Sequence, residues 1–384
     1  MSVSNLFTFK CLLIVTLSVL LASQLTTSLT PDERVACTRG LVCSVKKDTL
    51  DFLAVGDTGG ISFDISNHLK FLGITTPTQT QLGVALAMAH IAGQKPLDFV
   101  MNLGDNIYWN GAASVDDFRF KAVFENPYSD KRLQVPWYMI AGNHDHLGSV
   151  PAQIAYTQKS NKWTFPNYYY KASYAFGTGK QTTVDFIFID TIVLCGQTID
   201  VDGKTLFNWV TANFKVPEKP EKKHEKMAVE QWKWLEQQLK ESTADYIFVS
   251  GHYPVYTIAS RGTKCLINKL DPLMRKYNVT AYFSGHDHSL QYFHDDGKKS
   301  GSEMHYIVSG CGSRIGAWGL RVGVGNVKLV YWYPTLSVPI TELGVGLGGF
   351  VGVSVNSTQA TFKFYGNGIL TMKTASARPR TSKK

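Results

Sequence analysis

The sequence has few charged residues and lacks the patterns that mark fibrous or disordered proteins. Charged side chains make up 18% of the 384 residues, and no heptad pattern of apolar residues continues for more than a few turns, which excludes a coiled coil. An apolar share of 44% together with 33 glycines is typical of a compact protein rich in strands and turns, so disorder and collagen-like structure are excluded as well. A domain of roughly 300 residues buries about 75% of its unfolded surface, so this chain needs no disulfide scaffold to fold.

A basic surface for nucleic acid is also missing. The formal net charge is +9, but no element combines a stripe of cations with stacking aromatic side chains, so we expect no nucleic-acid partner, whereas anionic substrates remain possible. Residues 373–384 contain five cations and no acidic residue, which predicts a solvated basic tail. The five cations are Lys373, Arg378, Arg380, Lys383 and Lys384.

The N-terminus has the pattern of a secretory leader. Lys10 precedes an apolar run over residues 11–22 that is too short to span a bilayer, and a polar stretch with small residues follows. This pattern predicts a signal peptide over residues 1–29, with a buried strand or a membrane anchor as the alternative. Two triplets that begin at Asn278 and Asn356 are glycosylation acceptors, in agreement with a secreted or lysosomal protein.

Five cysteines remain after the predicted leader is removed. Cys37 and Cys43 could close a small loop, and Cys195 and Cys265 could pair across the fold. Cys311 would then stay unpaired.

Two stretches have the apolar spacing of helices, namely residues 78–93, where Gly93 suits the C-terminal cap, and residues 228–242. A third, short helix is predicted to begin with Asp271 as N-cap and Pro272 in its first turn, and to end near Asn278. The apolar residues expected on the buried faces are Leu82, Leu86 and Ala89 in the first helix and Val229, Trp232, Leu235 and Leu239 in the second.

Strands separate these helices, and β-rich sequence follows Met304 and ends in a hairpin around residues 366–368. Alternating strands and helices with a β-rich end predict an α/β fold of two packed sheets with helices outside. No internal repeat or linker divides the chain, so we expect one catalytic domain over residues 30–372. The charged segment 217–226 is predicted to be an exposed loop.

One local pattern occurs five times: an apolar strand, then a glycine, then a residue able to bind metal. Glycine allows a sharp turn at the end of the strand, and its missing Cβ leaves room for a ligand. If the strands are neighbours, all five ligands emerge at one edge of a sheet, where open α/β sheets form their sites. The strands and their metal-binding residues are 52–55 with Asp57, 99–103 with Asp105, 137–141 with Asn143, 246–250 with His252, and 280–284 with His286 and, two residues on, His288.

These donors are oxygens and imidazoles without a thiolate, and Tyr108, three residues after Asp105, adds a seventh. Seven donors exceed the needs of one tetrahedral ion, which favours two adjacent metals with Asp105 as the bridging carboxylate. A tyrosine has a pKa near ~10 and binds as phenolate only to a strongly acidic cation, which indicates Fe(III). Imidazole-rich ligation at the other position suits Fe(II) or Zn(II).

The five motifs, which begin at residues 57, 104, 142, 251 and 285, resemble those of the purple acid phosphatases, closest to the mammalian tartrate-resistant type. The resemblance covers about residues 50–310 and implies a four-layer metallophosphoesterase fold, two mixed β-sheets flanked by helices. It implies that Fe(III) is held by Asp57, Asp105, Tyr108 and His288, and a divalent Fe or Zn by Asp105, Asn143, His252 and His286. It also suggests that Cys195 pairs with Cys265.

The expected activity is hydrolysis of phosphate monoesters by a metal-activated hydroxide, in an acid phosphatase that we expect to be monomeric. His144 is expected to hydrogen-bond the phosphoryl oxygens or to protonate the leaving group. Asp145 would orient that imidazole or cap the loop, and His146 would lie just outside the ligand set. Five other histidines have no such context and are interpreted as ordinary: His68, His90, His224, His294 and His305.

The chain departs from the family pattern in two places. Ser260 and Arg261 replace an acidic residue and a histidine that are proposed to assist protonation in the mammalian type, which leaves the pH optimum and leaving-group preference open. The segment 312–342 is apolar and aromatic where a polar segment is expected. The loop 196–227 lies where relatives carry a protease-sensitive segment, so cleavage near Lys222 and Lys223 is expected to raise turnover. A related phosphodiesterase, or a non-catalytic secreted binding protein on the same scaffold, are the alternatives.

Overall fold

The computed structural model describes residues 36–38, 40–63, 74–197, 219–258, 262–316, 327–334 and 339–380. Residues from Val35 onward form one compact unit. The predicted signal peptide, Ser260 and Arg261, and most of the loop 196–227 lie outside the described residues.

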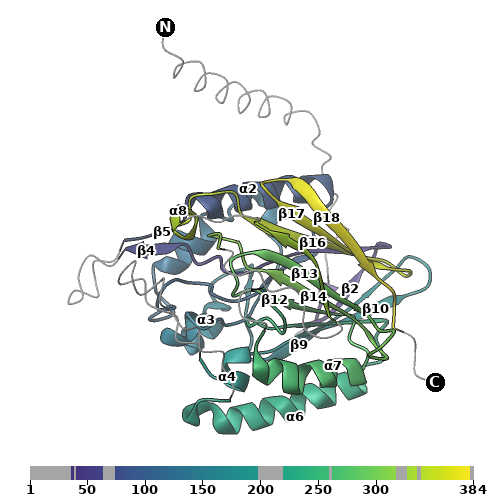
Figure 1. The fold of residues 1–384 in the computed structure, drawn as a ribbon. Coiled ribbons are helices and arrows are strands. Elements are labelled where there is room, and N and C mark those ends of the chain that lie inside the picture. The colour runs from purple at the N-terminus through teal and green to yellow at the C-terminus, as the bar shows by residue number, and fades with distance from the viewer. Residues whose placement is uncertain are drawn as a thin grey trace. The chain divides into compact units, whose positions relative to one another are not determined.

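Two mixed β-sheets face each other (Figure 1). The seven-stranded sheet has the order β18-β17-β16-β3-β6-β7-β8, and the nine-stranded sheet has the order β1-β2-β9-β10-β11-β12-β14-β13-β15. The first sheet consists of β3 (Leu50–Val55), β6 (Phe99–Asn102), β7 (Trp137–Met139), β8 (Trp163–Thr164), β16 (Gly349–Val355), β17 (Ala360–Gly366) and β18 (Leu370–Ala377). The second consists of β1 (Ala36–Cys37), β2 (Val42–Val45), β9 (Tyr170–Phe176), β10 (Thr182–Phe188), β11 (Tyr246–Ser250), β12 (Ala281–Ser284), β13 (Leu290–Asp296), β14 (Glu303–Ser309) and β15 (Lys328–Tyr333). A small ribbon is formed by β4 (Ile61–Phe63) and β5 (Ile74–Thr76).

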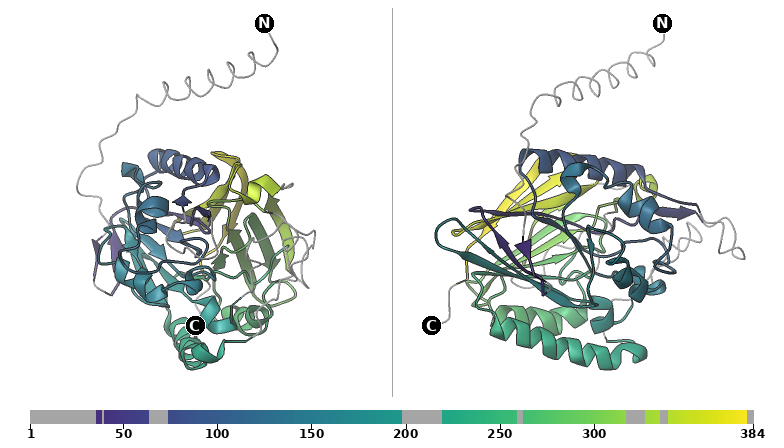
Figure 2. Two further views of the ribbon diagram at one scale, coloured as in Figure 1. Left: turned by 90° about the vertical axis from the view of Figure 1, so that its left-hand side faces the viewer. Right: turned by 180° about the vertical axis from the view of Figure 1, so that it is seen from behind.

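Helices cover the outer faces of both sheets. The long helix α2 (Gln79–Gln94) lies over the seven-stranded sheet, while α6 (Glu225–Glu241) and α7 (Asp271–Lys276) lie under the nine-stranded one (Figures 1 and 2). The shorter helices are α3 (Val150–Tyr156), α4 (Thr191–Cys195) and α8 (Pro339–Glu342), with π-helical turns η3 (Lys121–Glu125) and η7 (Leu266–Leu270) and 3-10 turns η4 (Lys131–Leu133), η5 (Asp145–Leu147) and η6 (Lys222–His224). The predicted layering of helix, sheet, sheet and helix is therefore confirmed.

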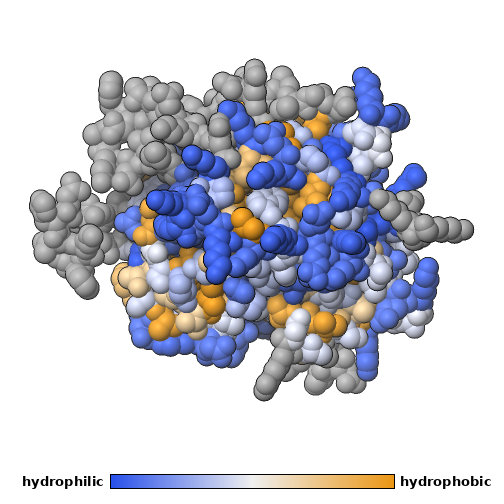
Figure 3. Space-filling model, turned by 90° about the horizontal axis from the view of Figure 1, so that it is seen from below, coloured by the Kyte–Doolittle hydropathy of each residue, from blue (hydrophilic) through white to orange (hydrophobic). Residues whose placement is uncertain are grey.

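The core between the sheets is aromatic. Phe52 of β3 stacks on Phe99 of β6 at 4.7 Å between ring centroids and meets Phe186 of β10 edge-on at 5.2 Å. Fully burying one such side chain stabilises the fold by about 1.5–3 kcal/mol, so these contacts hold the two sheets in one fixed arrangement. A second apolar core packs α6 and α7 against the nine-stranded sheet. The face seen from below in Figure 3 is mostly hydrophilic, with scattered apolar side chains.

The predicted apolar face of the first helix is confirmed at Ala89, which is buried, but wrong at the two leucines. Leu82 and Leu86 are 45% and 73% exposed, because α2 turns other apolar residues, such as Val84 and Met88, toward the sheet. The helix also continues past Gly93 to Gln94.

In the second helix Leu235 and Leu239 are buried as predicted, but Val229 is 54% exposed. This helix begins at Glu225, so the end of the segment predicted to be a loop is helical. Asp271 is not an N-cap, because η7 continues directly into α7 and the Asp271 carboxylate accepts hydrogen bonds from Arg275.

The basic tail is shorter than predicted. Lys373 lies within β18, which extends to Ala377. Arg380 donates hydrogen bonds to the carbonyl oxygens of Ala244 at 2.8 Å and Tyr277 at 3.0 Å, so the ordered fold extends past the expected boundary at residue 372. The hairpin is confirmed, with Asn367 and Gly368 between β17 and β18 at φ angles of 53° and 89°.

The cysteines pair as the sequence allowed. Disulfides join Cys37 to Cys43 and Cys195 to Cys265, and Cys311 is free and buried. The second bridge connects the end of α4 to the residue just before η7.

Candidate metal centre

The predicted ligands come from two sheets rather than from one edge. Asp57, Asp105 and Asn143 follow β3, β6 and β7, which are parallel neighbours in the seven-stranded sheet. The histidines follow β11 and β12, parallel neighbours in the nine-stranded sheet. Backbone hydrogen bonds join the two edges, as between Gly56 N and the carbonyl oxygen of Ser309 at 2.7 Å. The site therefore lies where the carboxyl ends of strands from both sheets meet.

Two glycines show why these strands end as they do. A Cβ on Gly142 would lie 2.1 Å from Asp105 Oδ1, and one on Gly104 would lie 2.6 Å from His252 Nδ1. Gly104 also has a φ of 92°, a conformation that other residues rarely adopt. Any side chain at these two positions would displace a candidate ligand.

Three candidate ligands have a strained backbone. Asp57, Asp105 and His286 adopt φ angles of 59°, 53° and 68°, in the left-handed region that non-glycine residues seldom occupy. Such conformations persist only where the surroundings enforce them, and they concentrate at functional sites.

One half of the cluster contains Asp57, Tyr108 and His288. Tyr108 Oη donates a hydrogen bond to Asp57 Oδ1 at 3.0 Å and lies 3.1 Å from His288 Nε2. His288 Nε2 and Asp57 Oδ1 are 3.6 Å apart. These three atoms thus converge on one point.

The other half contains Asp105, Asn143, His252 and His286. Asn143 Oδ1 lies 3.0 Å from His252 Nε2 and 3.1 Å from His286 Nδ1. Asp105 Oδ1 is 3.4 Å from His252 Nε2. Ligand atoms of Asp57, Asp105 and His252 all lie within 4.8 Å of one another, so the two halves form one continuous cluster.

Groups outside the cluster orient its imidazoles. His252 Nδ1 donates to the carbonyl oxygen of Leu103 at 2.8 Å, and His288 Nδ1 lies 2.9 Å from Glu342 Oε2. In both rings the remaining nitrogen, Nε2, is thereby directed into the cluster, an arrangement common to metal-bound histidines. The sequence analysis missed Glu342, because α8 carries no motif and is distant from His288 in the chain.

The protein's own charges shift the pKa values of these groups strongly. Burial raises the pKa of Asp57 to about 7. Burial lowers the pKa of His252, but the Asp105 and Asp57 carboxylates and the Leu103 carbonyl oxygen together outweigh it and raise that pKa to about 10. Burial also opposes ionisation of Asp105, yet the cationic histidines, His252 first, hold its pKa below the usual range. Burial and both carboxylates raise the pKa of Tyr108 well above its ordinary value.

These donors fit a pair of cations. Buried carboxylate, amide and phenol oxygens with imidazole nitrogens suit borderline and hard transition-metal ions. Protons on the histidines balance the negative charge of the buried carboxylates in the metal-free site. Metal cations would take the place of these protons. Tyr108 can be a phenolate here only beside a strongly acidic ion, since burial and the Asp105 and Asp57 carboxylates raise its pKa well above the ordinary value.

His144 lies beside this cluster, as predicted. Its backbone N–H donates to Asp105 Oδ1 at 3.0 Å, and its Nδ1 donates to the carbonyl oxygen of Trp109 at 2.7 Å. The carbonyl acceptor fixes the proton on Nδ1, so Nε2 is the nitrogen that can give or take a proton.

Asp145 does not orient His144, which corrects one of the two predicted roles. Its carboxylate accepts hydrogen bonds from the backbone N–H groups of Gly142 at 2.8 Å and Asn106 at 3.1 Å, so it caps the loop. His146 turns to Asp190, with Nε2 2.8 Å from Oδ2.

Arg314 is a buried site residue that the sequence analysis missed. Its guanidinium lies 3.9 Å from the centroid of the Tyr108 ring and 4.2 Å from that of Trp109, and it donates to the carbonyl oxygen of Gly60 at 2.7 Å. The positive charge of Arg314 lowers the pKa of Tyr108, against the effect of burial and of the two carboxylates. Arg314 lies in the segment that departs from the family pattern, where no motif could have indicated it.

Comparisons with known proteins agree with this geometry. Residues 50–290 match the family model of the calcineurin-like phosphoesterases. The chain is 39% identical to rabbit tartrate-resistant acid phosphatase type 5 over 267 residues, 69% of this chain and 73% of the relative, and 36% identical to the human protein over 82% and 86%. It is 30% identical to Arabidopsis purple acid phosphatase 7 over 83% of this chain and 82% of the relative.

Solved structures share the fold. GAP50 of Plasmodium aligns with a TM-score of 0.66 and 24% identity over 88% of this chain and 91% of its own. A purple acid phosphatase from yellow lupin aligns with a TM-score of 0.54 and 14% identity over 86% of this chain and 54% of its own. Among the described residues, no helix combines the length and apolarity needed to cross a membrane.

Proposed function

The chain belongs to the calcineurin-like phosphoesterases and, among them, to the purple acid phosphatases, and from this premise we propose that it is a binuclear acid phosphatase that hydrolyses phosphate monoesters. The observation that carries the proposal is the convergence of seven donors from five strand ends. All seven are present, and His144 accompanies them.

We assign Fe(III) to Asp57, Asp105, Tyr108 and His288, and Fe(II) or Zn(II) to Asp105, Asn143, His252 and His286. Asp105 would serve both ions, because its carboxylate has two oxygens and a ligand atom within 4.8 Å of those of Asp57 in one half and His252 in the other. A pair of cations in such a site supplies Lewis acidity, which neutralises the phosphate and makes water a better nucleophile at low pH.

The protein's own groups supply positioning and proton transfer. His144 is held by Trp109 through Nδ1, so its Nε2 donates a proton either to a phosphoryl oxygen or to the departing alkoxide. Arg314 packs against the Tyr108 ring, and Glu342 holds His288 through Nδ1, which leaves Nε2 beside the Tyr108 hydroxyl. No covalent enzyme intermediate is needed, because every group in the cluster can act through hydrogen bonds, charge or ligation.

Colour provides the first test. Purified protein is expected to contain two metals per chain, including iron, and to absorb visible light through charge transfer from the Tyr108 phenolate. The variant Tyr108→Phe should lose this band. Tyr128→Phe, which changes another fully buried tyrosine, should keep it. A colourless wild-type protein with one zinc per chain would contradict the assignment of Fe(III).

Substrate preference separates this proposal from its alternatives. A phosphomonoesterase should turn over aryl and alkyl monoesters faster than the corresponding diesters, and a phosphodiesterase the reverse. GAP50, which shares the fold, is the anchor in the inner membrane complex of Plasmodium. A comparable non-catalytic role for the present chain would mean that metal-loaded protein turns over neither class of ester. The complete donor set favours catalysis.

The loop 196–227 is proposed to restrain the site. Gln197 Nε2 donates to the carbonyl oxygen of Asn143 at 2.9 Å, which ties the start of the loop to a candidate ligand. At its other end, the His224 ring lies 5.4 Å from that of His146.

Cleavage near Lys222 and Lys223 is therefore expected to raise kcat several-fold, because opening and closing of loops often limits turnover. Limited proteolysis followed by kinetics on the re-purified protein measures this. Gln197→Ala should give part of the same increase without cleavage. Equal rates before and after trimming would refute a restraining loop.

We further propose that the protein is a secreted or lysosomal monomer glycosylated at Asn278 and Asn356. Asn356 lies in the turn between β16 and β17, and Asn278 lies between α7 and β12, both partly exposed. Two disulfides support an oxidising compartment.

A further inference from the structure

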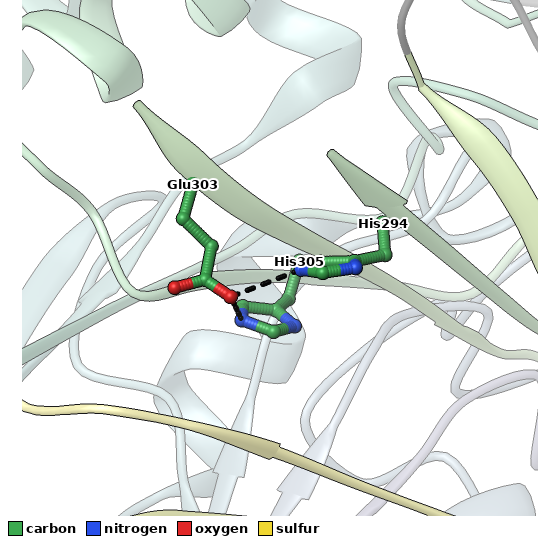
Figure 4. Close-up of side chains that lie close together, drawn as sticks. All are labelled: His294, Glu303 and His305. Carbon is green, nitrogen blue, oxygen red and sulfur yellow. Dashed lines mark hydrogen bonds and ion pairs between the residues drawn. The ribbon is translucent and has the colours of Figure 1, made fainter. Parts of the chain in front are cut away.

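A second group of side chains with metal-binding chemistry lies near the opposite end of the nine-stranded sheet from the catalytic cluster. It consists of His294 on β13 and Glu303 and His305 on β14 (Figure 4). His305 pairs with Ala281 at the start of β12, whereas His286 and His288 follow the end of β12. Five residues of strand correspond to roughly 15 Å, so the two groups are separate.

The strand register brings these three residues together. His294 is the cross-strand partner of His305, and Glu303 lies two positions before His305 on the same face of β14. The imidazoles stack with centroids 4.6 Å apart, and Figure 4 shows the Glu303 carboxylate directed at both.

The distances are close to those of a tetrahedral site. Glu303 Oε1 lies 3.0 Å from His294 Nε2 and 3.5 Å from His305 Nε2, and the three ligand atoms all lie within 4.8 Å of one another. Zinc bonds of about 2.0–2.2 Å in tetrahedral geometry separate neighbouring ligand atoms by about 3.4 Å. The two stacked imidazoles, whose planes are 22° apart, would turn to direct both Nε2 lone pairs at one ion.

His305 supplies an independent observation. The residue is 2% exposed, and its Nε2, which faces Glu303, is buried without a hydrogen-bond partner in the described part of the chain. Its Nδ1 lies 2.9 Å from Tyr292 Oη, so Nδ1–H can donate to the tyrosine while the Nε2 lone pair faces the cluster.

We propose that His294, Glu303 and His305 bind one zinc ion, distinct from the metal pair of the catalytic centre. Two imidazoles and one carboxylate match the ligands of three-residue zinc sites, while calcium and magnesium prefer oxygen alone. The Glu303 side chain is 47% exposed and that of His294 27%, so solvent reaches the fourth position. One Glu303 oxygen faces both Nε2 atoms, and that of His305, at 3.5 Å, makes no hydrogen bond in the described part of the chain.

Zinc content of the full-length protein tests the site. Protein with its catalytic metals in place is equilibrated with graded zinc, and bound metals are counted by mass spectrometry. Wild type should take up one ion more than His294→Ala and Glu303→Gln, which change two partly exposed side chains. Tyr292→Phe should weaken zinc binding by about 10–100-fold, as expected for the loss of a group that orients a ligand. Phosphatase activity should stay at the wild-type level in all three.

His90→Ala is the matched control, because His90 is an exposed histidine on α2 that contacts Gln94; it should bind zinc like wild type. Cobalt gives a second readout: wild type should show a tetrahedral cobalt spectrum that His294→Ala lacks, and zinc should raise the melting temperature of wild type more than that of the variant. Equal zinc content, cobalt spectra and melting shifts in wild type and His294→Ala would overturn the proposal.

Discussion

Replacing Asp105 with asparagine is expected to lower kcat/KM for a phosphomonoester by at least about 10³-fold, equivalent to ~4 kcal/mol of transition-state stabilisation. Asp105 is the one carboxylate proposed to serve both metals, and its Oδ1 also accepts the backbone N–H of His144 at 3.0 Å. Asparagine keeps the shape of the side chain but removes the negative charge and offers a single acceptor oxygen. We therefore expect weaker binding of the metal pair and a displaced loop around His144.

The measurement combines kinetics on p-nitrophenyl phosphate with metal analysis of the same preparation. Asp105→Asn should contain fewer than two metals per chain, and adding metal should restore little activity. Asp185→Asn is the matched control, because Asp185 is a mostly buried carboxylate held by Ser173 and Ser242, and no catalytic role is assigned to it. An Asp105→Asn variant with two metals and near-normal kcat/KM would contradict the bridging assignment.

The ligands themselves could be predicted from sequence because the information is local. A strand, a glycine and a donor lie within a few residues, and the turn that glycine permits is set by sterics alone. The structure adds the reason for the glycines at residues 104 and 142, where any Cβ would strike His252 or Asp105. The assignment of strands to two sheets was not predictable in this way, because pairing depends on contacts between distant segments.

The difference between local patterns and contacts of distant segments also explains which site residues the sequence analysis missed or misassigned. Glu342 and Arg314 reach the site from a segment without a motif, through contacts with His288 and Tyr108. Asp145 was open to two interpretations, because both an imidazole and a row of backbone N–H groups attract a carboxylate. On α2 the two leucines are exposed, because the face that packs on the sheet carries Val84, Met88 and Ile91 instead.

Removing the imidazole of His144 should separate proton transfer from metal binding. His144→Ala is expected to lower kcat by about 10²–10⁴-fold, the usual contribution of general acid catalysis, while both metals and the visible band remain. The substitution keeps the backbone N–H of His144 that donates to Asp105 Oδ1. It removes the imidazole, whose Nδ1 contacts the Trp109 carbonyl oxygen and whose Nε2 would transfer the proton. His146→Ala is the matched control, because His146 pairs with Asp190 and should change kcat little.

The leaving group then decides which role His144 has. An acid that protonates the departing oxygen matters most for alkyl phosphates, whose alkoxides are strongly basic, and least for p-nitrophenyl phosphate. If His144 acts in this way, the loss of kcat in His144→Ala should grow steeply with the pKa of the leaving group. An equal loss for all esters would assign His144 to the phosphoryl oxygens instead, because that contact does not depend on the departing alcohol. A variant with normal kcat on both ester classes would remove His144 from the reaction altogether.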